Sequence, residues 1–353
     1  MNPVRVLRVV TAVVLLVTLG WAVPSAHACA CGAVEPSNER ELGVNSETAA
    51  IMYDGTTETM AISMGLQTSS PEAAFLLPLP TTAEVATADK ELFDQLFDYT
   101  KPETRTRYRY WEFGDGSGGG GAPGSGATEG GATVEGRQRV GDYDVVQLSG
   151  TADEVGEWLT ENDFRVRPDV VAGLGEYLDQ DWNVMAVKLV FDGDFTGAMV
   201  PLVVSFPTDE LVYPMKLSGL AERRQNLRFY VFAEHRMDVR IGDTELSTYF
   251  AGRVDAATLR EAGAPAAADL VGDGEYVLTR IDDQVRPDRI TDDLGFSPHT
   301  AGDVEHREVE WVTVDRTWVT VLAIVGGVLV LAGATSAVAL VSYRRGRRAW
   351  RGE

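Results

Sequence analysis

The positions of apolar and polar residues along the chain predict a series of short strands. Residues 48–53 and 58–67 alternate on either side of an Asp-Gly turn pair, which indicates a β-hairpin. A short apolar run at 73–77 ends at Pro78, and because proline cannot donate to a β-ladder we expect the chain to leave the sheet there. β-prone runs predict further strands at 140–148, 184–191, 201–206, 213–217, 227–233, 237–241, 275–281 and 309–314.

Helical spacing of apolar residues is less frequent. In residues 88–100 apolar side chains recur every three to four positions, and a Lys-Pro pair ends the run. A second helix is expected after Thr151, because Glu154 stands three residues on and completes a capping-box pattern. The same spacing predicts helices at 168–179 and 255–262. Since strands outnumber helices and no fixed period repeats, the sequence predicts an α+β fold with a largely antiparallel sheet and a few short helices.

The N-terminal apolar run has the pattern of a secretory signal peptide. Arg5 and Arg8 precede an apolar run at 9–19, and Ala26-His27-Ala28 supplies a small-x-small ending. The run is too short for an ordinary membrane-spanning helix. We expect cleavage after residue 28; an uncleaved N-terminal anchor is the alternative.

The C-terminal apolar run is longer and predicts one transmembrane helix. Residues 319–342 contain no charge and no proline, and as a helix they rise about 36 Å, enough to cross a hydrocarbon core of about 30 Å. Trp318 and Tyr343 flank the run, and five arginines follow within residues 344–351. Because cationic flanks stay cytoplasmic, we expect the tail inside and the bulk of the chain outside. A buried core helix is the alternative.

These boundaries divide the chain into seven predicted parts. The assignments are a signal peptide at 1–28, a first ectodomain part at 29–113, a Gly-rich flexible insert at 114–136, a second ectodomain part at 137–298, a stalk at 299–317, a transmembrane helix at 318–343 and a basic cytoplasmic tail at 344–353. Eleven of the 23 residues in the insert are glycine, so it cannot bury a core. It also lacks the Gly-Lys-Ser/Thr sequence of a phosphate-binding loop.

Charge narrows the classes of partner. The whole chain has a formal net charge of −22. Without the two arginines of the signal, and the five arginines and Glu353 of the tail, 24 basic and 52 acidic residues remain, a net charge of −28. Such a surface repels nucleic acid and anionic headgroups and favours basic partners or cations, although a solvated acidic surface needs no partner. Two cysteines do not make a disulfide scaffold.

Five spaced segments give the sequence a family resemblance. They are Cys29-Ala30-Cys31-Gly32, the FLLPLP run at 75–80 with its following helix at 92–96, the VGDYDVVQL run at 140–148 leading into Glu157-Trp158-Leu159, VYPMKL at 212–217 and YVFAEHR at 230–236. In this order they resemble the domain-of-unknown-function family 2330, over most of residues 29–298. The resemblance implies a bacterial exported protein, often with a C-terminal membrane anchor and a Gly-rich insert. It implies no activity, substrate, cofactor or catalytic residue.

The pair Cys29 and Cys31 is the most specific candidate for a redox or metal site. A disulfide between positions i and i+2 closes a small, strained ring that is relatively easy to reduce. Two thiolates also suit a soft metal such as Cu(I), but a complete metal site usually needs more ligands. The other readings are a local structural disulfide that pins the N-terminus, or lipid attachment at Cys29. Ala26 stands where lipoprotein signals usually carry an aliphatic residue, which argues against attachment.

Other reactive residues are few. His235 follows an apolar strand and has the chemistry of a general base, although a hydrogen-bonded histidine at a sheet end is the commoner structure. Turn-like acidic clusters at 192–194 and 272–275 lack the spacing of a twelve-residue calcium loop. A few aromatic residues could line a ligand groove, although such residues more often pack in a core or at strand ends. They are Tyr213, beside Pro214, and the tryptophans Trp111, Trp158 and Trp182.

The sequence therefore predicts a single-pass membrane protein with an acidic extracytoplasmic domain. We expect a non-enzymatic module for surface interaction or envelope organisation, with the membrane and a protein at the cell surface as partners and no nucleic acid, cofactor or metal. The chain shows no Gly-x-Ser-x-Gly, His-Glu-x-x-His or Ser-x-x-Lys motif, and enzymatic activity is left open. The alternative is a thiol-redox or metal-handling exported protein that uses Cys29 and Cys31.

Overall fold

A computed structural model describes residues 33–36, 42–109, 133–141, 143–162, 164, 166–221 and 223–349. These residues form two compact units. The larger unit contains the described residues up to Lys101 and those from 133 to Arg307, and the smaller unit contains 102–109 and 308–349.

A nine-stranded sheet is the largest element of the larger unit. Its central hairpin joins β2 (Leu42–Tyr53) to β3 (Thr57–Thr68), as the alternating pattern predicts. The sheet order is β18-β15-β16-β12-β2-β3-β11-β5, with β10 also paired to β3. All its pairings are antiparallel except that of β12 with β2. The remaining strands are β5 (Glu84–Thr87), β10 (Phe195–Ala198), β11 (Leu202–Pro207), β12 (Gln225–Ala233), β15 (Thr248–Val254), β16 (Tyr276–Val285) and β18 (His306–Arg307).

Two smaller sheets complete the larger unit. A five-stranded antiparallel sheet has the order β1-β4-β9-β8-β7. Its strands are β1 (Ala33–Pro36), β4 (Glu72–Leu79), β7 (Thr133–Val140), β8 (Tyr143–Ser149) and β9 (Asn183–Val190). A three-stranded sheet, in the order β14-β13-β17, joins β13 (Met237–Ile241), β14 (Thr244–Glu245) and β17 (Leu294–Pro298).

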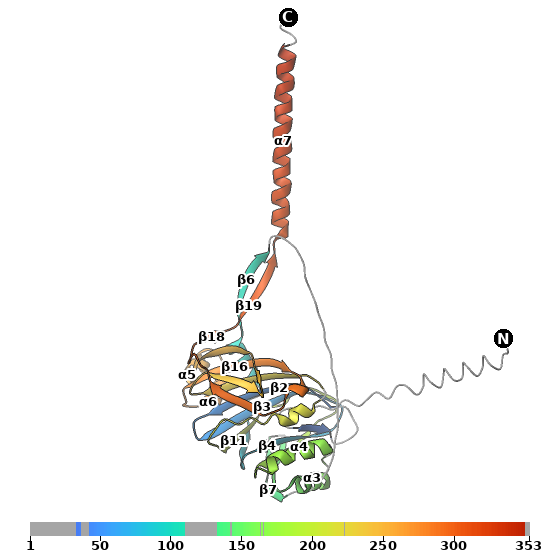
Figure 1. Cartoon of the computed structure of the whole chain (residues 1–353), viewed down its shortest axis with the longest axis vertical. Helices are drawn as coiled ribbons and strands as arrows, with labels where there is room; N and C mark the ends of the chain where they lie inside the picture. The colour runs from blue at the N-terminus through green and yellow to red at the C-terminus, as the bar shows by residue number, and fades with distance from the viewer. Residues whose placement is uncertain are drawn as a thin grey trace, which may run out of the picture. The chain divides into compact units, whose positions relative to one another are not determined.

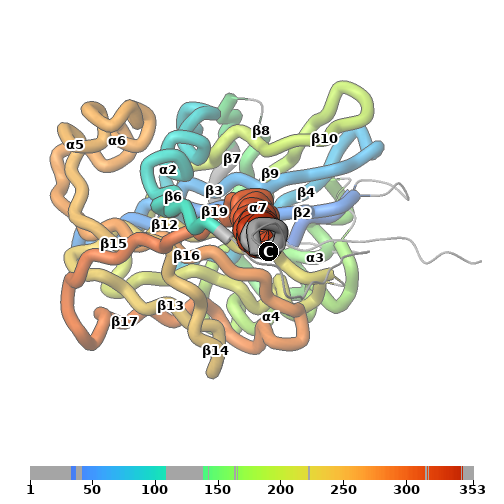
Figure 2. Tube along the Cα trace, turned by 90° about the horizontal axis from the view of Figure 1, so that it is seen from above, coloured from blue at the N-terminus to red at the C-terminus, as the bar shows by residue number. Residues whose placement is uncertain are grey.

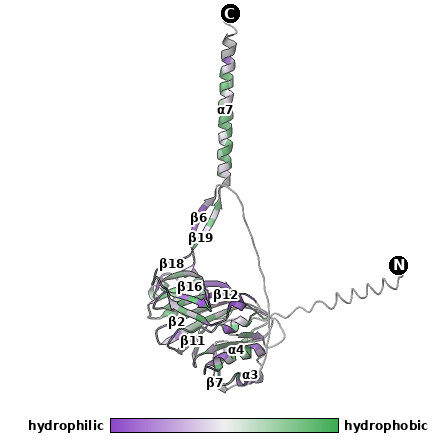
Figure 3. Ribbon diagram, viewed as in Figure 1, coloured by the Kyte–Doolittle hydropathy of each residue, from purple (hydrophilic) through white to green (hydrophobic). Residues whose placement is uncertain are grey.

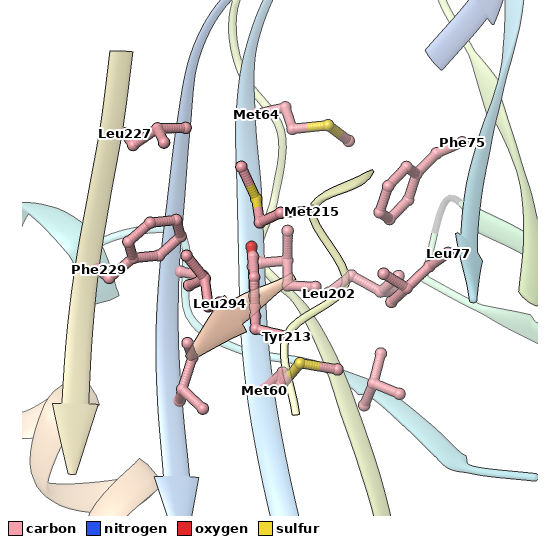
Figure 4. Close-up of a cluster of buried hydrophobic side chains, with 14 of the residues drawn as sticks. Met60, Met64, Phe75, Leu77, Leu202, Tyr213, Met215, Leu227, Phe229 and Leu294 are labelled. Atoms are coloured by element: carbon pink, nitrogen blue, oxygen red, sulfur yellow. The ribbon is translucent and has the colours of Figure 1, made fainter. Parts of the chain in front are cut away.

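The two larger sheets pack face to face over a shared apolar core. Alternate residues of β4, such as Phe75 and Leu77, join Met60 and Phe229 of the nine-stranded sheet in one buried cluster. In Figure 4, Tyr213 lies in this layer, between Phe229 on one side and Leu77 on the other. The period of two along each strand places successive side chains on opposite faces, so each sheet also has an outer apolar face to cover.

Helices cover those two outer faces. The helices α3 (Ala152–Glu161) and α4 (Pro168–Leu178) pack their buried apolar side chains in one cluster with Leu76 and Ala186 of the five-stranded sheet. Figure 1 shows both helices beside that sheet. On the nine-stranded sheet, α2 (Leu92–Thr100), α5 (Ala256–Glu261) and α6 (Pro265–Val271) pack on residues such as Tyr230 and Phe232, and Figure 2 shows them grouped together. The described part of the larger unit therefore has four layers, in the order helix, sheet, sheet, helix.

The smaller unit contains a two-stranded ribbon and one long helix. β6 (Glu103–Arg109) pairs in parallel with β19 (Val309–Asp315), which confirms a strand in the predicted stalk. The helix α7 (Thr317–Ala349) includes Trp318–Ser342, a stretch of mean hydropathy 2.3 that is long and apolar enough to cross a membrane. Figure 3 shows its hydrophobic colour over most of that length. None of this stretch is buried, so it is not a core helix of the described structure.

Three local predictions differ from the structure. Residues 213–217 form no strand: the chain has no regular structure up to Met215 and then enters a 3₁₀ helix (Lys216–Leu220), because Pro214 lacks an N–H and side chains bind the neighbouring amides. The chain does not leave the sheet at Pro78, which pairs with Val184 of β9. The opposite edge of β4 is unpaired there among the described residues, since β1 pairs no further than Leu76, and proline is tolerated at such an edge.

The predicted strand at 140–148 is two strands. β7 ends at Val140 and β8 begins at Tyr143, with Gly141 at a φ of +58° between them. A left-handed residue at a tight turn favours glycine, so Gly141 lies where the chain turns between the two paired strands. β7 begins at Thr133, within the last four positions of the predicted Gly-rich insert; residues 114–132 of that insert lie outside the described residues.

The capping box of α3 leads to a stability prediction. The Thr151 hydroxyl accepts the Glu154 amide at 3.3 Å, and the Glu154 carboxylate accepts the Thr151 amide at 2.8 Å. We expect Thr151→Ala to lower the free energy of unfolding by about 1 kcal/mol, because an amide of the first turn loses its acceptor. Urea unfolding of the full chain in detergent measures it. Glu157→Ala, at an exposed position of the same helix, is the control, and an equal loss in both variants would refute the capping role.

Candidate functional site

The larger unit contains an open cavity of about 630 Å³. Its walls come from three places far apart in the sequence: the irregular segment 209–213, the turn that joins β12 to β13, and β17. Tyr53 at the end of β2 and Trp182 before β9 complete it. The volume lies in the range of about 300–1,000 Å³ that is usual for small-molecule sites.

Side chains, rather than a β-ladder, hold the wall that segment 209–213 forms. The Val212 amide donates to the Glu58 carboxylate at 2.8 Å, and the Tyr213 hydroxyl donates to the Glu47 carboxylate at 2.6 Å. Both glutamates are fully buried between the sheets. The Tyr213 ring also packs edge-on against Phe229, with ring centroids 5.1 Å apart. The wall is therefore fixed from behind, by groups that do not themselves line the cavity.

Asp293 fixes the other end of the same segment. One of its carboxylate oxygens accepts the Met215 amide at 2.7 Å, the Lys216 amide at 3.2 Å and the Tyr177 hydroxyl at 2.5 Å. Burial, together with the nearby Asp293 carboxylate, holds the pKa of Tyr177 well above its usual range, so this phenol stays a donor. The Leu294 amide donates to the Tyr213 carbonyl at 3.0 Å and ties β17 to the wall.

Three partly exposed aromatic rings line the cavity. They are Tyr53, Trp182 and Phe296, whereas the Tyr213 ring is fully buried between the sheets. Trp182 packs against Tyr177 with ring centroids 5.1 Å apart, so its position depends on the same tyrosine that binds Asp293. Rings held in this way offer apolar walls and faces of negative electrostatic potential.

Charge in the cavity has one sign. Four carboxylates line it (Asp209, Glu210, Glu234 and Asp293), and none of its described lining residues is a lysine or an arginine. Asp209, Glu210 and Glu234 are exposed. The pKa of Tyr53 at the rim is raised, first by burial and then by a group of carboxylates that includes Asp209 and Glu210. The cavity mouth is therefore a region of negative potential.

Two buried carboxyl groups of the larger unit have a raised pKa. Burial raises the pKa of Glu58 to about 8, against the opposing effect of its hydrogen bond from the Val212 amide. Burial also raises the pKa of Glu35 in β1 to about 8, although the Arg167 guanidinium lies 3.2 Å from its carboxylate and favours the charged form. One oxygen of each carboxylate has no hydrogen-bond partner among the described residues. The Glu58 carboxyl, which has no cationic partner among the described residues, therefore carries a proton for most of the time at pH 7.

The structure brings together only part of the predicted site. Tyr213 and Trp182 do line the cavity, whereas Trp158 packs against Phe164 beside α3, and Trp111 lies outside the described residues. His235 is exposed at the end of β12 and lines the rim, with its Nδ1 3.4 Å from the Asp303 carboxylate. It thus has the hydrogen-bonded sheet-end position that the sequence favoured.

The remaining candidates give no metal or redox site in the described residues. The acidic cluster at 192–194 forms the turn between β9 and β10, and the cluster at 272–275 follows the end of α6. Among the described residues no group of three or more His, Cys, Asp or Glu side chains is placed to hold a metal ion. Cys29 and Cys31 lie outside the described residues, so their redox, metal and disulfide roles stay predictions.

Sequence reasoning missed most of the polar residues of the cavity. Asp293 and Tyr53 of the cavity, and Glu58 behind its wall, carried no motif, and they are brought together only by sheet pairing and by the path of segment 209–213. The one available signal was the proline in VYPMKL, which argued against a ladder strand at that position.

Comparison with known proteins agrees with the resemblance in the sequence. A family model described as an uncharacterized protein conserved in bacteria, DUF2330, matches residues 25–297. No curated protein and no solved structure matches the chain. The matched range contains every residue that lines the cavity except Pro298 and ends before α7 begins. The chain therefore belongs to the DUF2330 family of bacterial proteins.

Proposed function

We propose that this protein is a membrane-anchored, non-enzymatic binding module that holds its ligand in the cavity beside segment 209–213. α7 is its anchor in the cell membrane, the family domain lies outside the cytoplasm, and the arginine-rich tail lies inside. The signal-peptide pattern and the arginines at 344–351 support this orientation. The cavity, with its fixed aromatic and acidic lining, is the observation that carries the binding role.

The side chains around the cavity favour binding over nucleophilic catalysis. None of its described lining residues is a serine, threonine, cysteine or lysine, four of the residue types that act as nucleophiles in covalent catalysis. Asp293 is held by two backbone amides and a tyrosine, as suits a residue that shapes the wall. The polar groups nearest the centre therefore fix the shape of a cavity, which is what selective binding requires.

Position-specific cross-linking in intact cells tests the proposal. A photo-cross-linking amino acid at Leu211, which lines the cavity, is compared with one at Thr244, which is exposed on β14. We expect a recurrent cross-linked partner from position 211 that is absent from position 244 and persists when α7 is replaced by an unrelated membrane helix. Equal labelling from both positions, or none above background, would count against a binding module.

A further inference from the structure

The cavity combines two features that select for one sign of charge. Its described walls contain three partly exposed aromatic rings, and its rim carries three exposed carboxylates, Asp209, Glu210 and Glu234. No described lining residue is a lysine or an arginine that could neutralise them. An anionic ligand would meet repulsion from every charged side chain around this cavity except a protonated His235.

The floor of the cavity rules out a bare metal ion as the best ligand. The deeper lining is apolar or aromatic, with Met237, Leu294 and Phe296 among its residues. Asp293 uses one oxygen on three donors of the fold. A hard cation needs six or more oxygen ligands, whereas an organic cation needs an apolar surface, aromatic faces and diffuse negative charge.

A buried carboxyl group lies directly behind the wall. Glu58 is fully buried and binds the Val212 amide through one oxygen, while its other oxygen has no partner among the described residues. Val212 lines the cavity, and so does Tyr53, which pairs with Glu58 across the β2–β3 hairpin. A cation seated against this wall would favour the ionised form of the Glu58 carboxyl, which holds a proton for most of the time at pH 7 without it.

We propose that the cavity binds an organic cation: an ammonium group carried on an apolar body, with the charge among the carboxylates of the rim and the body against the aromatic walls. The ammonium belongs to a free amine or to a lysine side chain of a protein partner. This inference rests on the proposed binding function and names the chemical class of its ligand. Cation–π contacts and exposed carboxylates each add modestly, so selectivity comes from their sum.

Matched probes test the sign of charge. The full chain in phosphatidylcholine nanodiscs is titrated by calorimetry with phenethylammonium, with the uncharged phenethyl alcohol and with the anion 3-phenylpropionate. We expect the ammonium to bind about 10-fold or more tightly than either relative. A second pair, an acetylated and amidated peptide with a central lysine and its norleucine analogue, distinguishes the sources. The lysine peptide binding more tightly than phenethylammonium supports a protein partner, and the reverse order supports a free amine.

Charge-matched variants locate the site. Asp209→Asn, Glu210→Gln and Glu234→Gln together are expected to weaken ammonium binding about 5–10-fold. The control combines Asp243→Asn, Glu245→Gln and Glu275→Gln, three exposed acids that do not line the cavity, and is expected to bind like the parent. Both variants change the net charge equally, so a general electrostatic effect would weaken both alike and overturn the assignment of the site.

The outcomes separate this inference from the proposed function. If the uncharged probe binds as tightly as the ammonium, the cation preference is wrong, while a binding cavity remains. If no probe binds, the organic-cation inference is wrong, and the cross-linking comparison of positions 211 and 244 still decides whether the protein is a binding module.

Discussion

Replacing Phe229 by alanine is expected to lower the free energy of unfolding by about 3–5 kcal/mol. Phe229 is fully buried on the inner face of β12, where the two sheets meet. Its removal takes away apolar contacts and leaves a void that the paired strands on both sides, β2 and β16, cannot close. It also removes the edge-on contact with Tyr213, so segment 209–213, which forms one wall of the cavity, loses support.

Urea unfolding of the full chain in detergent, followed by circular dichroism, measures this effect. Val190→Ala is the control, because Val190 also lies on a strand but is 62% exposed, and we expect it to change the free energy by less than about 0.5 kcal/mol. Losses of similar size in the two variants would show that the layer between the sheets is not the principal core. Phe229→Leu keeps most of the volume and should recover part of the loss.

Local patterns in the sequence predicted elements where one short segment contains the whole cause. The β2–β3 hairpin needs only alternation around an Asp-Gly pair, and Gly55 in that turn has a φ of +96°. The start of α3 needs only Thr151 and Glu154. The long apolar helix with its flanking arginines was equally evident, since length and composition alone define it.

Elements that depend on distant partners could not be predicted in this way. β6 is a polar strand, ETRTRYR, and pairs with β19 about 200 residues further along the chain. The division of the strands into two packed sheets is likewise set by pairing, because inward and outward faces look the same in an alternating pattern. Residues 213–217 have strand-like composition, but Tyr213 and Met215 are held by the side chains of Glu47 and Asp293, which lie far away in the sequence.

The candidate site shows the same limit. Tyr213 and Trp182 were named from the sequence as aromatic candidates, because large aromatic rings are common in both grooves and cores. Asp209, Glu234 and Asp293 could not be distinguished from the many other acids of a chain with 53 aspartates and glutamates. Only the fold shows that they surround one cavity and that a buried glutamate binds its wall.

Replacing Glu58 by glutamine is expected to remove a large part of the pH dependence of stability. The pKa of this buried carboxyl is raised from 4.5 to about 8, so between these pH values the folded state holds a proton that the unfolded state has released. The free energy of unfolding therefore falls as the pH rises from about 4.5 to 8. A shift of this size corresponds to at most about 5 kcal/mol over the whole interval, and the stabilisation is fully present only below pH 4.5.

Glutamine is neutral and nearly isosteric, so its amide oxygen can still accept from Val212 without titrating. Urea unfolding of the full chain at several values between pH 4.5 and 9 should give a clearly flatter profile for Glu58→Gln, with the residual slope due in part to Glu35, whose pKa is also raised to about 8. Glu84→Gln, at an exposed position of β5, should leave the parent profile unchanged. If the profiles of Glu58→Gln and the parent coincide, Glu58 is not protonated in the folded protein.

An ammonium bound at the cavity would favour the ionised carboxylate, so phenethylammonium should lower the pKa of Glu58 in the parent chain.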